Sequence, residues 1–267
     1  MSASWIGAFS RDIKISGGSR TIGPAVLLLF VACALGHSQD ASARTGRLTA
    51  RPRLPSSEPV PGFSVLAIGR DRDALLYVPP AAKAGPVPLM VLLHGAGGSA
   101  SGLRDRLFRS TDSIGFALLI PDSRGPTWDA IRGGYGPDIA FIDSAIKVVF
   151  SRVAVDATRL IVGGFSDGAS YALALGRING DLFSRVVAFS PGFVPPGRAT
   201  GKPEIFITHG SDDRILPYES TSGRIAPALK RAGYLVTIRT FAGGHTVPAE
   251  LAREAFRWAI STANTTR

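Results

Sequence analysis

The amino-acid sequence predicts an α/β protein built on one mainly parallel β-sheet. From residue 63 onward, short apolar runs alternate with longer segments of helical period, as in repeated βαβ units. The run 89–93 is apolar throughout, which is typical of a strand buried on both faces of a sheet. The chain has 267 residues, 45% hydrophobic and 19% charged, which suits one large domain and excludes a wholly disordered chain.

The first two strands are expected at 63–68 and 74–78, joined by a polar turn, and they should pair antiparallel. Six further strands are predicted at 89–93, 117–120, 160–162, 186–189, 204–208 and 235–241. Helices are predicted between them at 102–113, 138–150, 167–178, 220–232 and 248–262. Right-handed crossovers then give a central sheet of about eight strands, flanked by helices. The segment 190–203 is rich in proline and glycine, so no helical lid is expected there.

The residues before position 63 resemble a targeting segment rather than a folded domain. The run 22–35 is uncharged and apolar, follows basic residues, and is shorter than the ~20 residues of a membrane-spanning helix. We interpret 1–43 as a signal peptide, cleaved near residue 36 or 43, for a secreted or periplasmic protein. A membrane anchor at 22–35 and lipidation at Cys33 are the alternatives; the mass of the mature protein from its host distinguishes them. The Pro- and Arg-rich stretch 44–62 is expected to be a disordered linker, and 63–267 the single folded domain.

Composition excludes several classes of function. The net charge of +10 is spread along the chain without a basic run interleaved with aromatic residues, so nucleic acid is not an expected partner. A single cysteine excludes an intramolecular disulfide framework and a thiolate zinc cluster. Only four histidines are present, so a His-rich metal site is not predicted. No cofactor is predicted either, because the chemistry inferred below needs none.

The main candidate for chemistry is the sequence Gly-Phe-Ser-Asp-Gly at 164–168. It follows the predicted strand 160–162 and opens the helix 167–178. In that context Gly-x-Ser-x-Gly is typical of a tight strand-to-helix turn that exposes a nucleophilic serine, here Ser166. The pattern alone is weak, and its position gives it weight.

A serine hydroxyl needs a base to accept its proton, and the candidates are His94, His209 and His245. His245 lies between the last strand and the last helix, where it can reach the end of a central strand, and we expect it to be the base. The orienting carboxylate should lie between serine and histidine in the chain, which leaves Asp212 and Asp213.

Two backbone N–H groups are expected to stabilise an oxyanion. One belongs to Asp167, directly after the serine and at a helix N-terminus. The other should come from the glycine-rich loop His-Gly-Ala-Gly-Gly at 94–98, with Ala96 the expected donor. Trp128, Tyr135 and Phe193 lie in predicted loops that could form an acyl or aryl pocket, so they are candidate substrate-binding residues; plain packing is the alternative for each.

Four motifs in this order resemble the α/β-hydrolase superfamily: residues 94–98, residues 164–170, His209-Gly210 with Asp213 and Pro217, and Gly244-His245 with Pro248. The chain is similar to the bacterial phospholipase/carboxylesterase group and to secreted polyhydroxybutyrate-depolymerase-like and feruloyl-esterase-like proteins. The resemblance implies an α/β-hydrolase fold and favours Asp213 over Asp212. The chain departs from the family pattern at two points. It lacks the cysteines that the depolymerases often carry near the oxyanion loop, and it has Asp167 where many thioesterase-like relatives have glutamine.

The sequence therefore predicts a serine esterase that cleaves short-chain or soluble carboxylic esters through Ser166, His245 and Asp213. A polyester depolymerase, a feruloyl or acetyl-xylan type of esterase, and a non-catalytic binding protein of the same fold are the alternatives. The expected partner is a small-molecule ester, without stable membrane insertion after signal cleavage. The expected assembly is a monomer or a homodimer.

Overall fold

The structure is a computed structural model that describes residues 44–107 and 115–262. The predicted signal peptide, with its apolar run, its cleavage sites and Cys33, lies outside these residues. So does the end of the helix predicted at 102–113. Among the described residues, no helix is both long enough and apolar enough to cross a membrane.

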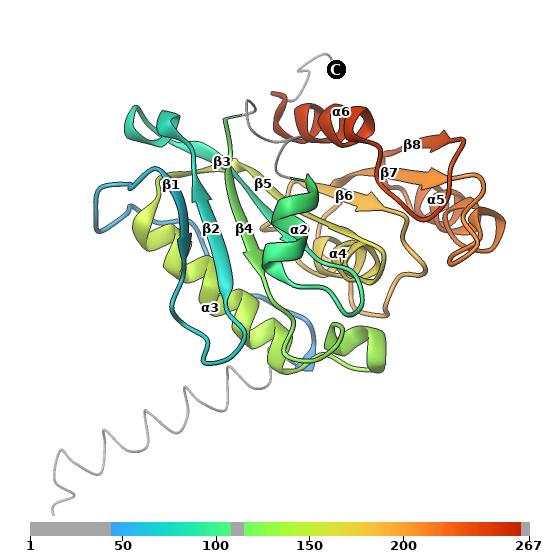
Figure 1. The fold of residues 1–267 in the computed structure, drawn as a ribbon, viewed down its shortest axis with the longest axis horizontal. Coiled ribbons are helices and arrows are strands. Elements are labelled where there is room, and N and C mark those ends of the chain that lie inside the picture. The colour runs from blue at the N-terminus through green and yellow to red at the C-terminus, as the bar shows by residue number, and fades with distance from the viewer. Residues whose placement is uncertain (1–43, 108–114, 263–267) are drawn as a thin grey trace, which may run out of the picture. The chain divides into compact units, whose positions relative to one another are not determined.

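Eight strands form one sheet in the order β1-β2-β4-β3-β5-β6-β7-β8 (Figure 1). The strands are β1 (Gly62–Val65), β2 (Ala74–Val78), β3 (Val87–Leu93), β4 (Ala117–Pro121), β5 (Val155–Phe165), β6 (Arg185–Phe189), β7 (Glu204–Gly210) and β8 (Val236–Phe241). β1 and β2 are antiparallel to their neighbours, and β4, β3 and β5 to β8 pair in parallel. The predicted mostly parallel sheet is confirmed. The first strand ends earlier than predicted, and β5 begins earlier.

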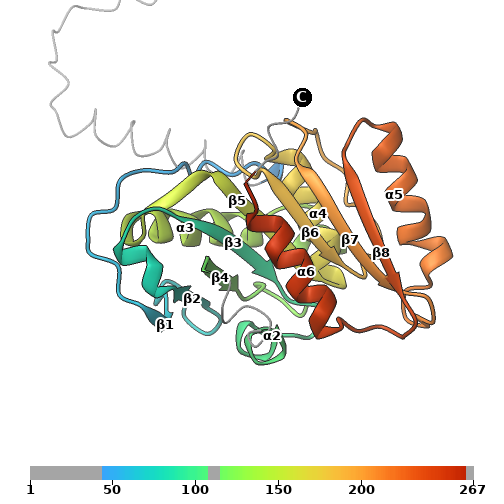
Figure 2. The ribbon, with the colours of Figure 1, turned by 90° about the horizontal axis from the view of Figure 1, so that it is seen from above.

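Within residues 44–107 and 115–262, five α-helices lie on the two faces of the sheet: α2 (Ala100–Leu107), α3 (Pro137–Arg152), α4 (Asp167–Ile178), α5 (Ser222–Arg231) and α6 (Ala249–Ile260). Short 3-10 helices occur at η1 (Pro80–Lys83), η3 (Asp129–Arg132) and η4 (Tyr218–Ser220). Side chains of α3, α4 and α5 share one core, whereas α2 and α6 pack in the core on the opposite face. Figure 2 shows α6 crossing one face with α3 and α4 behind the strands.

This arrangement brings the loops that carry the candidate residues to one edge of the sheet. The five strands β3 and β5 to β8 are parallel, so their carboxyl ends meet there, as in other open α/β sheets. The segment 190–203 between β6 and β7 contains no helix, in agreement with the prediction that no helical lid is inserted there.

The expected disordered linker differs from the structure in its first part. Leu48 is buried in the core beside α3 and α4, and its N–H group donates to the side-chain oxygen of Asn179 at 2.8 Å. The N–H groups of Thr49 and Ala50 both donate to the carboxylate of Asp143 at 2.7 Å. Composition suggested a linker because the segment has no apolar period. Its order comes from distant polar side chains that accept its backbone hydrogen bonds.

Candidate active site

Ser166 occupies a strained turn between β5 and α4. Its backbone angles are φ 57° and ψ −119°, in a region that residues with a Cβ atom rarely adopt. The flanking glycines allow this turn. A Cβ atom at Gly164 would lie 2.3 Å from the carbonyl oxygen of Gly168, and one at Gly168 would lie 2.2 Å from that of Leu93. Only hydrogen fits at either position, so α4 packs tightly on β3 and Ser166 lies at the edge of the sheet.

A chain of two hydrogen bonds links Ser166 to an aspartate. The Oγ atom of Ser166 is 2.9 Å from Nε2 of His245, and Nδ1 of His245 is 2.7 Å from Oδ2 of Asp213. These residues come from the β5–α4 turn and from the loops after β8 and β7. Ser166 is largely buried, at 9% exposed. With the imidazole proton on Nδ1, Nε2 is free to accept the serine proton.

Asp213 is held in a fixed orientation. Its Oδ1 atom accepts the N–H groups of Ile215 at 2.9 Å and Leu216 at 2.8 Å. Its Oδ2 atom lies 2.7 Å from Nδ1 of His245 and 3.2 Å from Nε2 of His209. Burial would raise the pKa of Asp213, but the hydrogen bonds from Leu216, His245 and Ile215 outweigh it and hold the pKa below its ordinary value of 3.8. The carboxyl group is therefore ionised at neutral pH. Asp212 is exposed, so the structure places Asp213 and not Asp212 beside the histidine.

The other two candidate bases are occupied by structural contacts. His94 is buried, its Nε2 atom accepts the N–H group of Ser123 at 3.0 Å, and its Nδ1 atom lies 2.8 Å from the carbonyl oxygen of Gly95. Burial lowers the pKa of His94, which keeps the ring neutral. His209 is also buried, with its ring nitrogens 2.7 Å from Ser222 Oγ and from the Leu216 carbonyl oxygen. Of these three histidines, His245 is the one that contacts Ser166.

The loop 94–98 lies directly against the serine. A Cβ atom at Gly95 would be 3.3 Å from the Cβ atom of Ser166. The N–H group of Asp167 belongs to the first turn of α4, where helical N–H groups have no partner within the helix. Within the described part of the chain, the N–H groups of Ala96 and Asp167 have no hydrogen-bond acceptor. Both predicted donors therefore remain available beside the serine for a developing negative charge.

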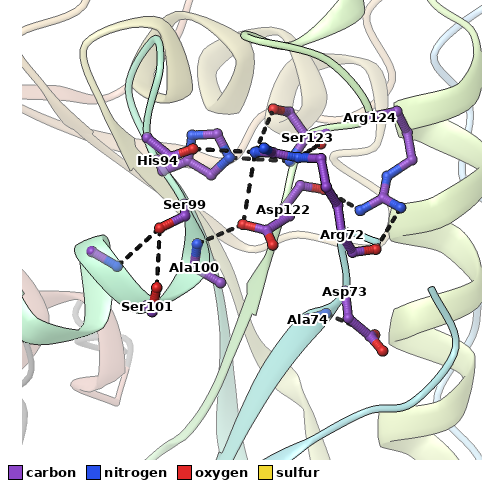
Figure 3. A network of polar contacts seen from close by, with 12 residues as sticks. Arg72, Asp73, Ala74, His94, Ser99, Ala100, Ser101, Asp122, Ser123 and Arg124 are labelled. Atoms are coloured by element: carbon purple, nitrogen blue, oxygen red, sulfur yellow. Dashed lines mark hydrogen bonds and ion pairs between the residues drawn. The ribbon is translucent and has the colours of Figure 1, made fainter. Parts of the chain in front are cut away.

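A polar network behind this loop holds it in place (Figure 3). The guanidinium group of Arg72 donates to the carbonyl oxygen of Gly98 at 3.1 Å and also to the carbonyl oxygen of Ser123. Ser123 in turn donates its N–H group to His94. Asp122 accepts the N–H group of Ala100 at 2.6 Å. Arg72 thus connects the loop after β3 to the loop after β4, so it should act by positioning Ala96.

Arg72→Ala should therefore lower kcat for a small ester about tenfold and change KM little, because one misplaced oxyanion donor costs transition-state stabilisation rather than substrate binding. Steady-state kinetics with p-nitrophenyl acetate measures both constants. Arg70→Ala is the matched control, because Arg70 is exposed in the same turn. An unchanged kcat in Arg72→Ala would show that the loop keeps its shape without this side chain.

The three predicted substrate-binding residues have different positions. Trp128 is 0% exposed, stacks on Tyr171, and donates its indole N–H to the carbonyl oxygen of His94 at 2.8 Å. Its indole ring packs in the core and supports the loop 94–98 through this hydrogen bond. The prediction that Trp128 binds substrate is therefore wrong, because a fully buried side chain cannot contact a ligand. Tyr135 and Phe193 both line a large cavity beside α4.

Two polar residues near the site had no signal in the sequence. Arg72 lies in a charged turn that resembles any exposed loop, and Thr127 is one of several loop hydroxyls. Thr127 donates its hydroxyl to the carboxylate of Asp167 at 2.6 Å, which ties the loop after β4 to the start of α4. Neither contact follows a period or a motif, since each joins segments that are distant along the chain.

Known proteins resemble this chain in sequence. Residues 139–255 match the model of the phospholipase/carboxylesterase family. NocK of Nocardia uniformis subsp. tsuyamanensis, named as an esterase, is 28% identical over 191 residues, which cover 66% of this chain and 56% of NocK. The bifunctional acetylxylan esterase/xylanase XynS20E of Neocallimastix patriciarum is 27% identical over 162 residues, 58% of this chain and 23% of that protein. The chain thus spans about half or less of the length of these two curated relatives.

The fold has solved counterparts. The s-formylglutathione hydrolase FrmB from Staphylococcus aureus superposes with a TM-score of 0.61 at 14% identity, covering 78% of this chain and 100% of FrmB. At this identity the similarity concerns the fold alone. The predicted resemblance is confirmed by the family match and by these counterparts. The protein has the α/β-hydrolase fold and resembles the phospholipase/carboxylesterase family.

Proposed function

We propose that this protein is a serine hydrolase of carboxylic esters. The observation that carries the proposal is the pair of hydrogen bonds, at 2.9 and 2.7 Å, that joins Ser166 through His245 to Asp213. The positive φ angle at Ser166 supports it, because strain of this kind is concentrated at functional sites. The esterase relatives agree with this class of reaction.

The geometry suggests a two-step reaction. Ser166 Oγ attacks the ester carbonyl carbon as its proton passes to His245 Nε2, and the negative oxygen accepts the N–H groups of Ala96 and Asp167. The tetrahedral intermediate then breaks its bond to the alcohol oxygen, which receives the proton from His245. Water next loses a proton to His245 as its oxygen attacks the acyl carbon. The second tetrahedral intermediate then breaks its bond to Ser166 Oγ, which takes the proton back from His245, and the carboxylic acid leaves. The ionised Asp213 stabilises the imidazolium in both steps.

A small cavity beside the serine sets the size of the acyl group. It has a volume of about 150 Å³ and is lined by the loop 94–98, part of α2 and Phe165, the residue before the serine. A cavity of roughly this volume accommodates about six carbon atoms, the size of benzene. We infer that the acyl chain enters this space, which favours short acyl groups.

We therefore expect kcat/KM for p-nitrophenyl esters to be highest between the C2 and C6 acyl chains and to fall at C8 and beyond, since a longer chain would expose its apolar end to water. The measurement is hydrolysis across the C2–C12 series, below and above the solubility limit of each ester. Ser166→Ala corrects for background hydrolysis. A maximum at C12 with a rise in rate above the solubility limit would contradict the short acyl site and indicate a lipase.

A further inference from the structure

A second and larger cavity lies along α4, on the side of the sheet that also carries α3. Its volume is about 1090 Å³, and its walls come from two loops: residues 130–135 around η3, and residues 193–200 between β6 and β7. The ordered segment at 44–47 closes the end. Tyr135 joins the two walls, because its hydroxyl donates to the carbonyl oxygen of Pro196 at 2.9 Å.

This groove begins close to the nucleophile. The N–H group of Gly192, next to the lining residue Phe193, donates to Ser170 Oγ at 2.9 Å, and the N–H group of Ser170 donates to the carbonyl oxygen of Ser166. Phe193 therefore lies one helical turn from the serine, and it is 43% exposed. An exposed aromatic ring at this place can contact the part of an ester that leaves the reaction centre.

The other end of the groove is at the last turn of α4. The N–H group of the lining residue Thr200 donates to the carbonyl oxygen of Arg177 at 2.8 Å. A Cβ atom at Gly197 would lie 2.3 Å from Cδ1 of Ile178, the last residue of α4. An α-helix rises about 1.5 Å per residue, so the groove end at Ile178 lies about 12 Å from the end at Ser170 and about 18 Å from Ser166.

This distant end is positively charged. The groove is lined by three arginines, Arg44, Arg47 and Arg198, and by no acidic residue. Arg47 is neutralised by a paired contact with Asp181 at 2.9 Å. Within the described ranges, Arg44 and Arg198 have no ion-pair partner.

Arg177 adds to this charge from the side of the helix. Its Nε atom is buried and has no hydrogen-bond partner in the described structure. Burial raises the pKa of Tyr135 to about 12, and the positive charge of Arg177 partly opposes that rise, which places this charge close to the groove wall. Arginines without partners beside an apolar surface favour a ligand with an anionic oxygen group, because the guanidinium group binds carboxylate and phosphate in a two-pronged geometry.

We propose that the groove binds the alcohol part of the ester and selects alcohols that carry a carboxylate or phosphate at the Arg44–Arg198 end. The assignment rests on the proposed esterase function and on the position of the small acyl cavity, which leaves the larger space for the alcohol. Phe193 contacts the part of the alcohol next to the ester, and the Tyr135 ring, which lies beside Ile178, contacts the part near the charged group. The charged group then lies about 15–18 Å from the ester carbonyl.

The test uses three acetyl esters on the same oligo(ethylene glycol) spacer, long enough to follow α4, that end in a carboxylate, a phosphate or a neutral carboxamide. For the wild-type chain we expect kcat/KM to be about tenfold higher for the better anionic ester than for the carboxamide, through a lower KM. Added salt should reduce this ratio, because the arginines are near the surface. The ranking of carboxylate and phosphate identifies which group the site prefers.

Arg198→Ala combined with Arg44→Ala should reduce the ratio to within a factor of about two. The matched control is Arg253→Ala, which removes an exposed arginine from α6 on the opposite face of the sheet and should keep the full ratio. Calorimetric binding of the carboxylate ester to Ser166→Ala gives a readout that does not depend on turnover. Equal rates on charged and neutral esters by an enzyme that hydrolyses p-nitrophenyl acetate would overturn the groove assignment alone. Failure to hydrolyse any ester would overturn the proposed function.

Discussion

Ser166→Ala is expected to lower kcat for p-nitrophenyl acetate by about 10⁴- to 10⁶-fold while the fold is retained. The reason is that the serine oxygen is the atom that forms the acyl-enzyme, and residues of such a triad act as a unit. Alanine keeps the Cβ atom and removes only the hydroxyl oxygen, so the packing around Gly164 and Gly168 is undisturbed. Loss of the hydroxyl contact with His245 should not lower the melting temperature.

The measurement combines single-turnover and steady-state kinetics with thermal unfolding of both proteins. Ser170→Ala is a useful second variant, because Ser170 lies one turn further along α4 and its hydroxyl accepts the N–H group of Gly192. It should reduce kcat by less than tenfold. Retention of more than a tenth of the wild-type activity in Ser166→Ala would remove Ser166 as the nucleophile.

Asp213→Asn should lower kcat by about 10⁴-fold, and the contacts in the structure explain why. The side-chain oxygen of the asparagine can still accept hydrogen bonds from the N–H groups of Ile215 and Leu216, which both donate to Oδ1 of the aspartate. Its amide NH₂ group then faces Nδ1 of His245. Nδ1 must accept a hydrogen bond, the ring proton moves to Nε2, and Nε2 can no longer accept the proton of Ser166.

The matched control is Asp212→Asn, one residue earlier in the same loop. Asp212 is exposed, so the kcat of the Asp212→Asn enzyme should stay within a factor of about three of the wild-type value. The pH dependence adds a second readout. The activity lost in Asp213→Asn should recover partly at high pH, where hydroxide can accept the proton of Ser166 in place of His245. If Asp212→Asn is the more damaging change, the carboxylate that orients His245 would have to be reassigned.

Much of the fold follows from local features of the sequence. The continuous apolar runs at 89–93 and 186–189 predict strands buried on both faces, and the structure has β3 and β6 there. The helix predicted at 167–178 is α4 with the same ends. Periodicity works here because each strand or helix buries a face that its own residues define.

The tight strand-to-helix turn at Ser166 could also be predicted, because the residues that it requires are neighbours in the chain. Two glycines are needed where α4 crosses β3 and β5, and the serine between them must adopt a positive φ angle. The motif Gly-x-Ser-x-Gly is typical of that geometry. The identity of the histidine followed from its loop, because parallel strands bring their carboxyl ends to one edge.

Other features of the site were decided only by the tertiary structure. The motif order favoured Asp213, but its distinction from Asp212 rests on which carboxylate is turned inward by the N–H groups of Ile215 and Leu216. Trp128 looked like a pocket residue because aromatic side chains occur both in pockets and in cores; its burial under His94 decides the matter.

The sequence by itself determined the order of the strands and helices, the nucleophile elbow and the edge of the sheet where the chemistry lies, since all of these depend on residues close together in the chain. Only the tertiary structure decided that Arg72 supports the loop 94–98, that residues 46–51 pack on the body, and that a groove with unpaired arginines follows α4. These features depend on contacts between segments up to about half the chain apart. No local pattern of apolar and polar residues predicts such contacts. The partners of each hydrogen bond or charge are distant in the chain, and only folding brings them together.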